Sequence, residues 1–143
     1  MTENTYWRYN GSIVNTIEDF PIGTVGFVYE IVNTIEGWRY VGKKSLYSVR
    51  TLPPLKGQKR KRKVTKQSDW LKYYSSNTYI KDYIKTKGEI GIEREILMLC
   101  SSKKLLTYYE NKYLYCKSVI EPNSIYLNDN ISGKLFKGDF LVK

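Results

Sequence analysis

Two apolar segments joined by a short turn constrain the fold of this chain most strongly. Residues 25–33, VGFVYEIVN, form a run typical of a buried strand, and residues 38–43, WRYVGK, return after the turn segment TIEG. Side chains alternate between the two faces of a strand, so Tyr29 and Tyr40 are expected on the same side of neighbouring strands. Gly42 would leave an open space beside them. The alternative is a tyrosine-rich sheet face that binds nothing.

The segments around this hairpin predict further strands and helices. They are an N-terminal hairpin over residues 6–14, helical stretches over 68–74 and 76–88, a strand over 89–100 and a helix over 102–120. This order predicts an α+β fold with a small, mainly antiparallel three-stranded central sheet flanked by helices and preceded by an N-terminal β arm. The predicted boundaries are residues 1–24 for the arm, 25–133 for the domain and 134–143 for a C-terminal tail.

A basic segment interrupts the domain at residues 53–68, PPLKGQKRKRKVTKQS. It holds seven Lys and Arg and no Asp or Glu, whereas the whole chain has a net charge of +10. Such a run repels itself and predicts a mobile loop inserted into the domain. The concentrated charge indicates a polyanionic partner, with nucleic acid favoured over an anionic membrane. A merely solvated loop is the alternative.

The chain contains no histidine, which limits the chemistry open to it. Nucleophiles activated by histidine and histidine-ligated metals are excluded, so a base must be Tyr, Lys, Asp, Glu or a metal-bound water. A metal would bind oxygen ligands, which favours Mg²⁺ or Mn²⁺. Cys100 and Cys116 form no CxxC pair and are typical of a reducing compartment. The sequence shows no signal peptide and no apolar run long enough to span a membrane, so a cytoplasmic location without a membrane partner is expected.

Several motifs, taken in order, resemble the GIY-YIG nuclease superfamily. FVY, followed after ten residues by YVG, is similar to its two-part signature, and Arg50 follows where the family carries an arginine on a helix. The segment IEREILMLCSSKKLLTYYENKYL resembles the third strand and the helix with the metal-binding glutamate, here Glu110. YLNDNISG resembles the closing asparagine segment, with Asn128 as the match. The resemblance covers residues 25–133 and extends to small phage-encoded proteins related to homing endonucleases, which implies the cytoplasm of a bacterial host cell.

The resemblance implies a Mg²⁺-dependent (or Mn²⁺-dependent) DNA endonuclease that hydrolyses phosphodiester bonds. Arg50 would grip the phosphate through two N–H groups, and Glu110 would hold the metal. Tyr29 would position or deprotonate the attacking water, which requires a nearby cation to lower its pKa, and Tyr40 would supply a supporting hydrogen bond. Lys44 is the second choice for a direct catalytic part.

The candidate DNA contacts lie around these residues. They are Lys43, Lys59, Arg60, Lys61, Arg62, Lys63 and Asn128. Asn128 would touch DNA or orient the glutamate helix, with Asn130 as its rival; Glu93 and Glu95 compete with Glu110 for the metal.

The missing histidine and the variant YVGKK motif support a different class of function, a catalytically inactive protein of the same fold that binds nucleic acid. A basic structural or ribosome-associated protein would explain the charge but not the ordered motifs. Monomer and homodimer both remain open.

Overall fold

The centre of the fold is the predicted hairpin, formed by strand β3 (Gly26–Asn33) and strand β4 (Arg39–Ser45). The pairing places Tyr29 opposite Gly42 and Ile31 opposite Tyr40, so both tyrosines point to one face as predicted. The computed structural model describes residues 5–140; residues 1–4 of the predicted arm and 141–143 of the predicted tail lie outside the described residues.

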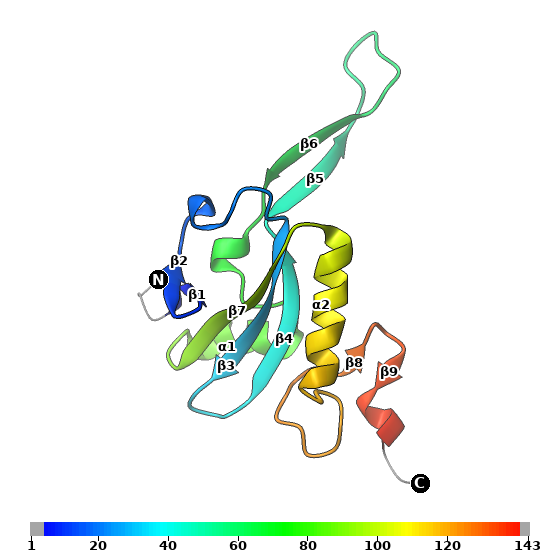
Figure 1. Cartoon of the computed structure of the whole chain (residues 1–143). Coiled ribbons are helices and arrows are strands. Elements are labelled where there is room, and N and C mark those ends of the chain that lie inside the picture. Colours follow the sequence, from blue (N-terminus) through cyan, green and yellow to red (C-terminus); the bar gives the residue numbers. More distant parts are fainter. Residues whose placement is uncertain (1–4, 141–143) are drawn as a thin grey trace.

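The fold is of the α+β class. Its main sheet has five strands in the order β2-β1-β7-β3-β4 (Figure 1). Strand β7 (Ile92–Cys100) runs antiparallel to β3, and β1 (Trp7–Tyr9) runs parallel to β7. The predicted N-terminal hairpin forms between β1 and β2 (Ser12–Val14), with Asn10 and Gly11 at φ 49° and 82° as a tight turn requires. Because β1 pairs with β7, this hairpin enlarges the expected three-stranded sheet to five strands.

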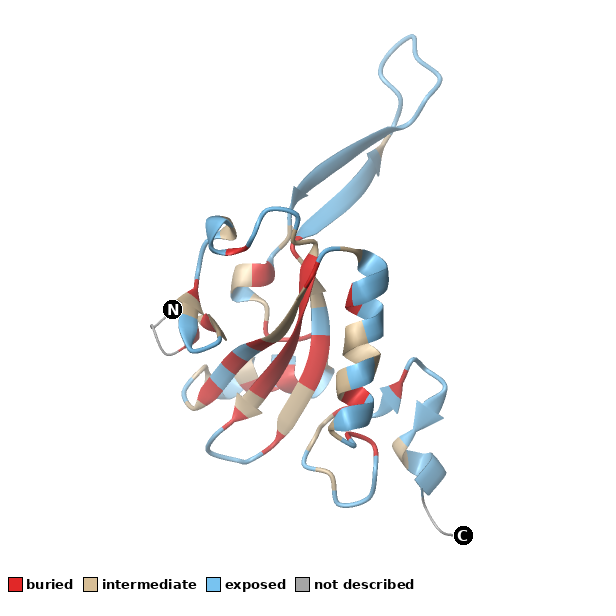
Figure 2. Cartoon of the chain, in the orientation of Figure 1, coloured by how far each residue is buried: buried red, intermediate tan, exposed pale blue. Residues whose placement is uncertain are grey.

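One helix packs on each face of the sheet, so β3 is almost fully buried (Figure 2). Helix α1 (Thr78–Lys87) and the 3-10 turn η3 (Trp70–Lys72) cover the face that carries Tyr29. Helix α2 (Lys103–Cys116) covers the other face, and Ser102 caps its first turn.

Four other short elements lie outside the main sheet and the two helices. They are η2 (Ile17–Asp19), β8 (Asn130–Ile131), β9 (Leu135–Phe136) and η4 (Lys137–Phe140). No helix within residues 5–140 has the length and apolar character needed to cross a membrane.

The basic segment is an ordered hairpin, and the prediction of a mobile loop over 53–68 is wrong for its second half. Strand β5 (Tyr47–Leu52) pairs with β6 (Arg62–Gln67), and the two strands project away from the main sheet (Figure 1). The backbone N–H of Ser68 donates to the carbonyl of Leu46 at 2.8 Å, and the Ser68 hydroxyl donates to the Ser45 carbonyl at 2.6 Å. These bonds hold the two ends of the hairpin together where it leaves the main sheet.

A buried arginine anchors the segment between this hairpin and α1. Arg94 on β7 is 1% exposed, and its guanidinium donates to the carbonyls of Thr5, Leu71 and Tyr73. Burial lowers the pKa of Arg94 to about 10, so the group remains charged at neutral pH. The arginine therefore fixes Tyr73 beside the tyrosines of β3 and β4.

Candidate active site

The candidate site lies at the outer edge of β4, which has no strand beyond it. Backbone hydrogen bonds from residues 125 and 127 cover this edge at Arg39. At Val41 the side chain of Asn128 takes over: its Oδ1 accepts from the Val41 N–H at 3.0 Å, and its Nδ2 donates to the Val41 carbonyl at 2.7 Å. The amide of Asn128 therefore replaces the peptide group of a neighbouring strand.

The two candidate asparagines have different surroundings. Asn128 is 6% exposed and bound to the sheet edge, whereas Asn130 is exposed and its Oδ1 accepts from the backbone N–H of Gly133 at 2.9 Å. The bond made by Asn130 is turn chemistry. Asn128 is thus the asparagine that organises the site.

A polar cavity of about 280 Å³ opens where this edge meets α2. Its walls are formed by Tyr40, Val41, Asn77, Glu110, Leu114, Asn128, Asp129, Asn130 and Ser132. Tyr40 belongs to the tyrosine face of the sheet, and Glu110 reaches the cavity from the helix on the opposite face. Because β4 is the last strand of the sheet, side chains from both faces can line the same cavity, which brings together three of the residues predicted from the sequence.

The buried tyrosines form a cluster behind this cavity. Tyr29 is 1% exposed, and its ring centroid lies 6.4 Å from that of Tyr40 and 5.9 Å from that of Tyr73. A Cβ atom added to Gly42 would lie 2.5 Å from the Tyr29 hydroxyl oxygen. The expected open space at Gly42 is therefore filled by the Tyr29 ring.

The electrostatic surroundings of both phenols keep them protonated. Burial raises the pKa of Tyr29 well above its ordinary value, and Tyr73 and Tyr40 act in the same direction. Burial also raises the pKa of Tyr40, while the hydroxyl groups of Ser75 and Ser76 partly oppose it. The expected lowering of the Tyr29 pKa by a cation is wrong, because desolvation dominates. Both phenols can donate a hydrogen bond at neutral pH.

The predicted cations occupy different places. The Lys43 ammonium donates to the hydroxyl of Thr107 on α2 at 3.0 Å. Lys44 lies on the tyrosine face, where its Nζ is 2.5 Å from Asp69 Oδ1 and 3.9 Å from the Tyr73 ring centroid. Arg50 lies on β5 opposite Val64 in the projecting hairpin, so the expectation of a helical position is wrong, and it does not line the cavity.

Glu110 has the properties expected of a metal ligand. Burial raises the pKa of Glu110, and Lys43 only partly opposes that shift. Within residues 5–140 no hydrogen bond or salt bridge reaches this carboxylate, and Lys43 acts on it only at longer range. Those same residues contain no group of three His, Cys, Asp or Glu side chains that could hold a metal ion. Glu110 and Asp129 both line the cavity, and two carboxylates are compatible with Mg²⁺, which commonly uses one or two protein carboxylates and keeps several waters.

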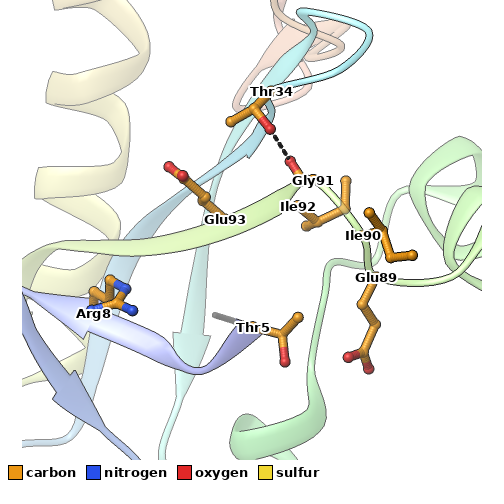
Figure 3. Close-up of a pocket in the computed structure, with 8 residues that line it drawn as sticks. All are labelled: Thr5, Arg8, Thr34, Glu89, Ile90, Gly91, Ile92 and Glu93. Carbon is orange, nitrogen blue, oxygen red and sulfur yellow. Dashed lines mark hydrogen bonds between the residues drawn. The ribbon is translucent and has the colours of Figure 1, made fainter. Parts of the chain in front are cut away.

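The rival carboxylates lie away from this cavity. Glu93 and Glu95 are exposed on β7, and Glu93 lines a larger cavity of about 690 Å³ formed by the start of β7, the turn after β3 and the N-terminal segment (Figure 3). The larger cavity contains neither Tyr40 nor Glu110. Its size alone therefore does not identify the site.

Three residues at or near the candidate site were not predicted from the sequence: Asp69, Tyr73 and Asp129. Tyr73 packs on Tyr29, Asp69 pairs with Lys44, and Asp129 lines the cavity. Their contacts are long-range, and no local periodicity specifies them.

The comparison with protein families agrees with this geometry. The model of the family described as "Putative endonuclease segE, GIY-YIG domain" matches residues 7–131. The matched region begins at β1 and ends at β8, so it includes every strand of the main sheet and every residue that lines the cavity except Ser132. No curated protein and no solved structure matches the chain.

Proposed function

The chain belongs to the segE family of GIY-YIG endonuclease domains, and on this basis we propose that it is a divalent-metal-dependent endonuclease that hydrolyses DNA phosphodiester bonds. The observation that carries the proposal is that Tyr40, Glu110 and Asn128 line one cavity, where burial raises the pKa of the Glu110 carboxyl group. Phosphodiester hydrolysis needs an activated water and neutralisation of charge on the phosphoryl oxygens. The cavity offers hydrogen-bond donors and a metal ligand for these tasks.

We assign the metal-binding role to Glu110, with Mg²⁺ or Mn²⁺ as the ion. When bound, such an ion supplies positive charge for the phosphate and lowers the pKa of a coordinated water. Tyr40 donates its phenol hydrogen to the water or phosphate in the cavity, and Tyr29 holds the Tyr40 ring in place from behind. Lys44 provides positive charge on the tyrosine face.

The DNA contacts are proposed at the cavity, on the neighbouring surface of β4 and α2, and on the projecting hairpin. Lys43 lies on β4 beside α2, and Asn128 lines the cavity itself. The projecting hairpin supplies the remaining cations: Arg50, Lys59, Arg60, Lys61, Arg62 and Lys63. Because Arg50 lies on this hairpin, we propose that it binds the substrate outside the reacting centre.

Incubation with supercoiled plasmid tests the proposal. In Mg²⁺ the protein should convert the plasmid to nicked or linear forms, and EDTA should abolish the conversion. Glu110→Ala should slow cleavage by roughly 100-fold or more, as loss of a group that stabilises transition-state charge does in other enzymes. Glu95→Ala is the matched control, because it removes an exposed carboxylate from β7. Full activity of Glu110→Ala, with folding confirmed by circular dichroism, would refute the assignment.

A second candidate function is nucleic-acid binding without catalysis. It is favoured by the absence of histidine and by the position of Arg50 outside the cavity. In the same assay this function would give salt-sensitive retention of the plasmid in gels without any cleavage, in either Mg²⁺ or Mn²⁺.

A further inference from the structure

The β5–β6 hairpin, with the loop that joins its strands, is called the ribbon here and comprises residues 47–67. Every strand residue of the ribbon except Leu52 is exposed, so both faces are open (Figure 2). An isolated two-stranded hairpin is marginally stable in water because it buries little apolar surface. A ribbon that projects with both faces exposed is suited to insertion into a groove of a partner molecule.

The charge of the ribbon specifies a polyanionic partner. It contains eight Lys and Arg and no Asp or Glu. Within residues 5–140 none of these cations forms a salt bridge, since the four ion pairs found lie elsewhere. Their charge is therefore available to phosphate groups.

The two faces of the ribbon differ in charge. Strand register places Ser48 opposite Lys66, Arg50 opposite Val64 and Leu52 opposite Arg62. Since residues opposite each other share a face and alternate residues along a strand share a face, Arg50, Arg62 and Lys66 lie together. We call this the arginine face. The other face carries a single strand cation, Lys63, beside hydroxyl and apolar side chains.

The dimensions of the ribbon match one kind of nucleic acid. Its two strands lie ~4.8 Å apart, and with side chains they fit the B-DNA major groove, which is ~12 Å wide and admits a two-stranded ribbon. Residues two apart are ~7 Å apart along a strand, close to two base-pair steps of ~3.4 Å along the DNA helix axis. A-form RNA has a deep, narrow major groove, and a single strand has no groove.

From these observations we infer that the ribbon enters the major groove of duplex DNA with its arginine face toward the base edges. Arg50 and Arg62 then donate to N7 and O6 of guanine, the acceptors that a guanidinium can bind through two N–H groups. This inference rests on the proposed function only in taking DNA as the substrate. It names the form of that substrate and assigns Arg50 a role in reading it.

Guanine methylation tests the inference directly. Dimethyl sulfate modifies guanine N7 in the major groove, so duplex DNA saturated with the full-length protein in EDTA should show reduced methylation at bound positions. Arg50→Ala should abolish that protection and lower the ratio of duplex to single-strand affinity by at least ~5-fold. Lys63→Ala, which removes one charge from the other face, should weaken binding to both DNA forms equally and retain the protection.

The possible outcomes separate the inference from the proposed function. Protection that is absent in the wild-type protein, or unchanged in Arg50→Ala, overturns the inference even when plasmid cleavage is active. Protection that Arg50→Ala removes supports the inference, even in a protein that cuts no plasmid. Both substitutions are at exposed positions, and thermal melting checks that the variants remain folded.

Discussion

Replacement of Asn128 by alanine tests whether this side chain completes the edge of β4. The change removes both hydrogen bonds to Val41, at 3.0 and 2.7 Å, from a residue that is 6% exposed. A typical hydrogen bond contributes ~0.5–1.5 kcal/mol, and a buried group left without a partner costs ~1–3 kcal/mol. Because the neighbouring cavity admits water to the freed peptide group, we expect a total loss of about 1–3 kcal/mol in the free energy of unfolding.

Urea denaturation followed by tryptophan fluorescence measures this loss, since Trp7 and Trp70 are buried in the core. Asn130→Ala is the control, because it removes one exposed turn bond and should cost less than about 0.5 kcal/mol. Equal stability of Asn128→Ala and Asn130→Ala would refute the reasoning.

Asn128→Asp provides a sharper form of the same test. The substitution keeps the shape but places a carboxylate oxygen where Nδ2 now donates to the Val41 carbonyl. Only the protonated carboxyl can restore that bond, so its folded-state pKa is raised. The variant should therefore be most stable at acidic pH and lose stability as the pH rises through that pKa. A pH-independent loss would show that the carbonyl is not the partner that matters.

Three further predictions concern the site and the ribbon. Burial raises the pKa of Glu110, so its ionisation opposes folding: the contribution of Glu110 to stability is greatest below pH ~4.5 and is lost as the pH rises through the folded-state value. Glu110→Gln should flatten this profile in melting experiments without metal, raise the melting temperature at neutral pH and remove any stabilisation by Mg²⁺. Gly42→Ala should cost about 1–3 kcal/mol in urea denaturation because the new Cβ meets the Tyr29 ring, and a loss below ~0.5 kcal/mol would show that the ring moves freely. Replacement of residues 59–63 by serine should reduce the slope of log K against log salt by up to ~0.9 per lost phosphate contact, and an unchanged slope would exclude these residues from the interface.

Local signals were sufficient to predict the central hairpin. Tyr29 and Tyr40 share a face because side chains alternate along both strands, and a short turn sets their register. The capping residue Ser102 was equally readable, since its hydroxyl accepts from the N–H three residues later. The meeting of Glu110 with Asn128, in contrast, was expected only from the family resemblance. No period in the sequence specifies contacts between a helix and a distant loop.

The ribbon shows why part of the fold escaped prediction. RKVTKQ at β6 and YSVRTL at β5 contain β-branched residues with the alternation of a strand, but the density of lysine and arginine indicated a loop. Charge disfavours a strand only when it must be buried, and both faces of this hairpin are exposed. The docking of β1 beside β7 was missed for another reason, since that pairing joins residues more than 80 positions apart.

The bonds between Ser68 and the carbonyls of Ser45 and Leu46 have a consequence for how this chain could be re-engineered. They bring Leu46 and Ser68 so close together that the ribbon should be replaceable by a short glycine linker between these two residues. The truncated protein should keep the cavity lined by Glu110 and lose the contacts with duplex DNA that we propose for the ribbon, and another DNA-binding segment could be inserted at the same junction.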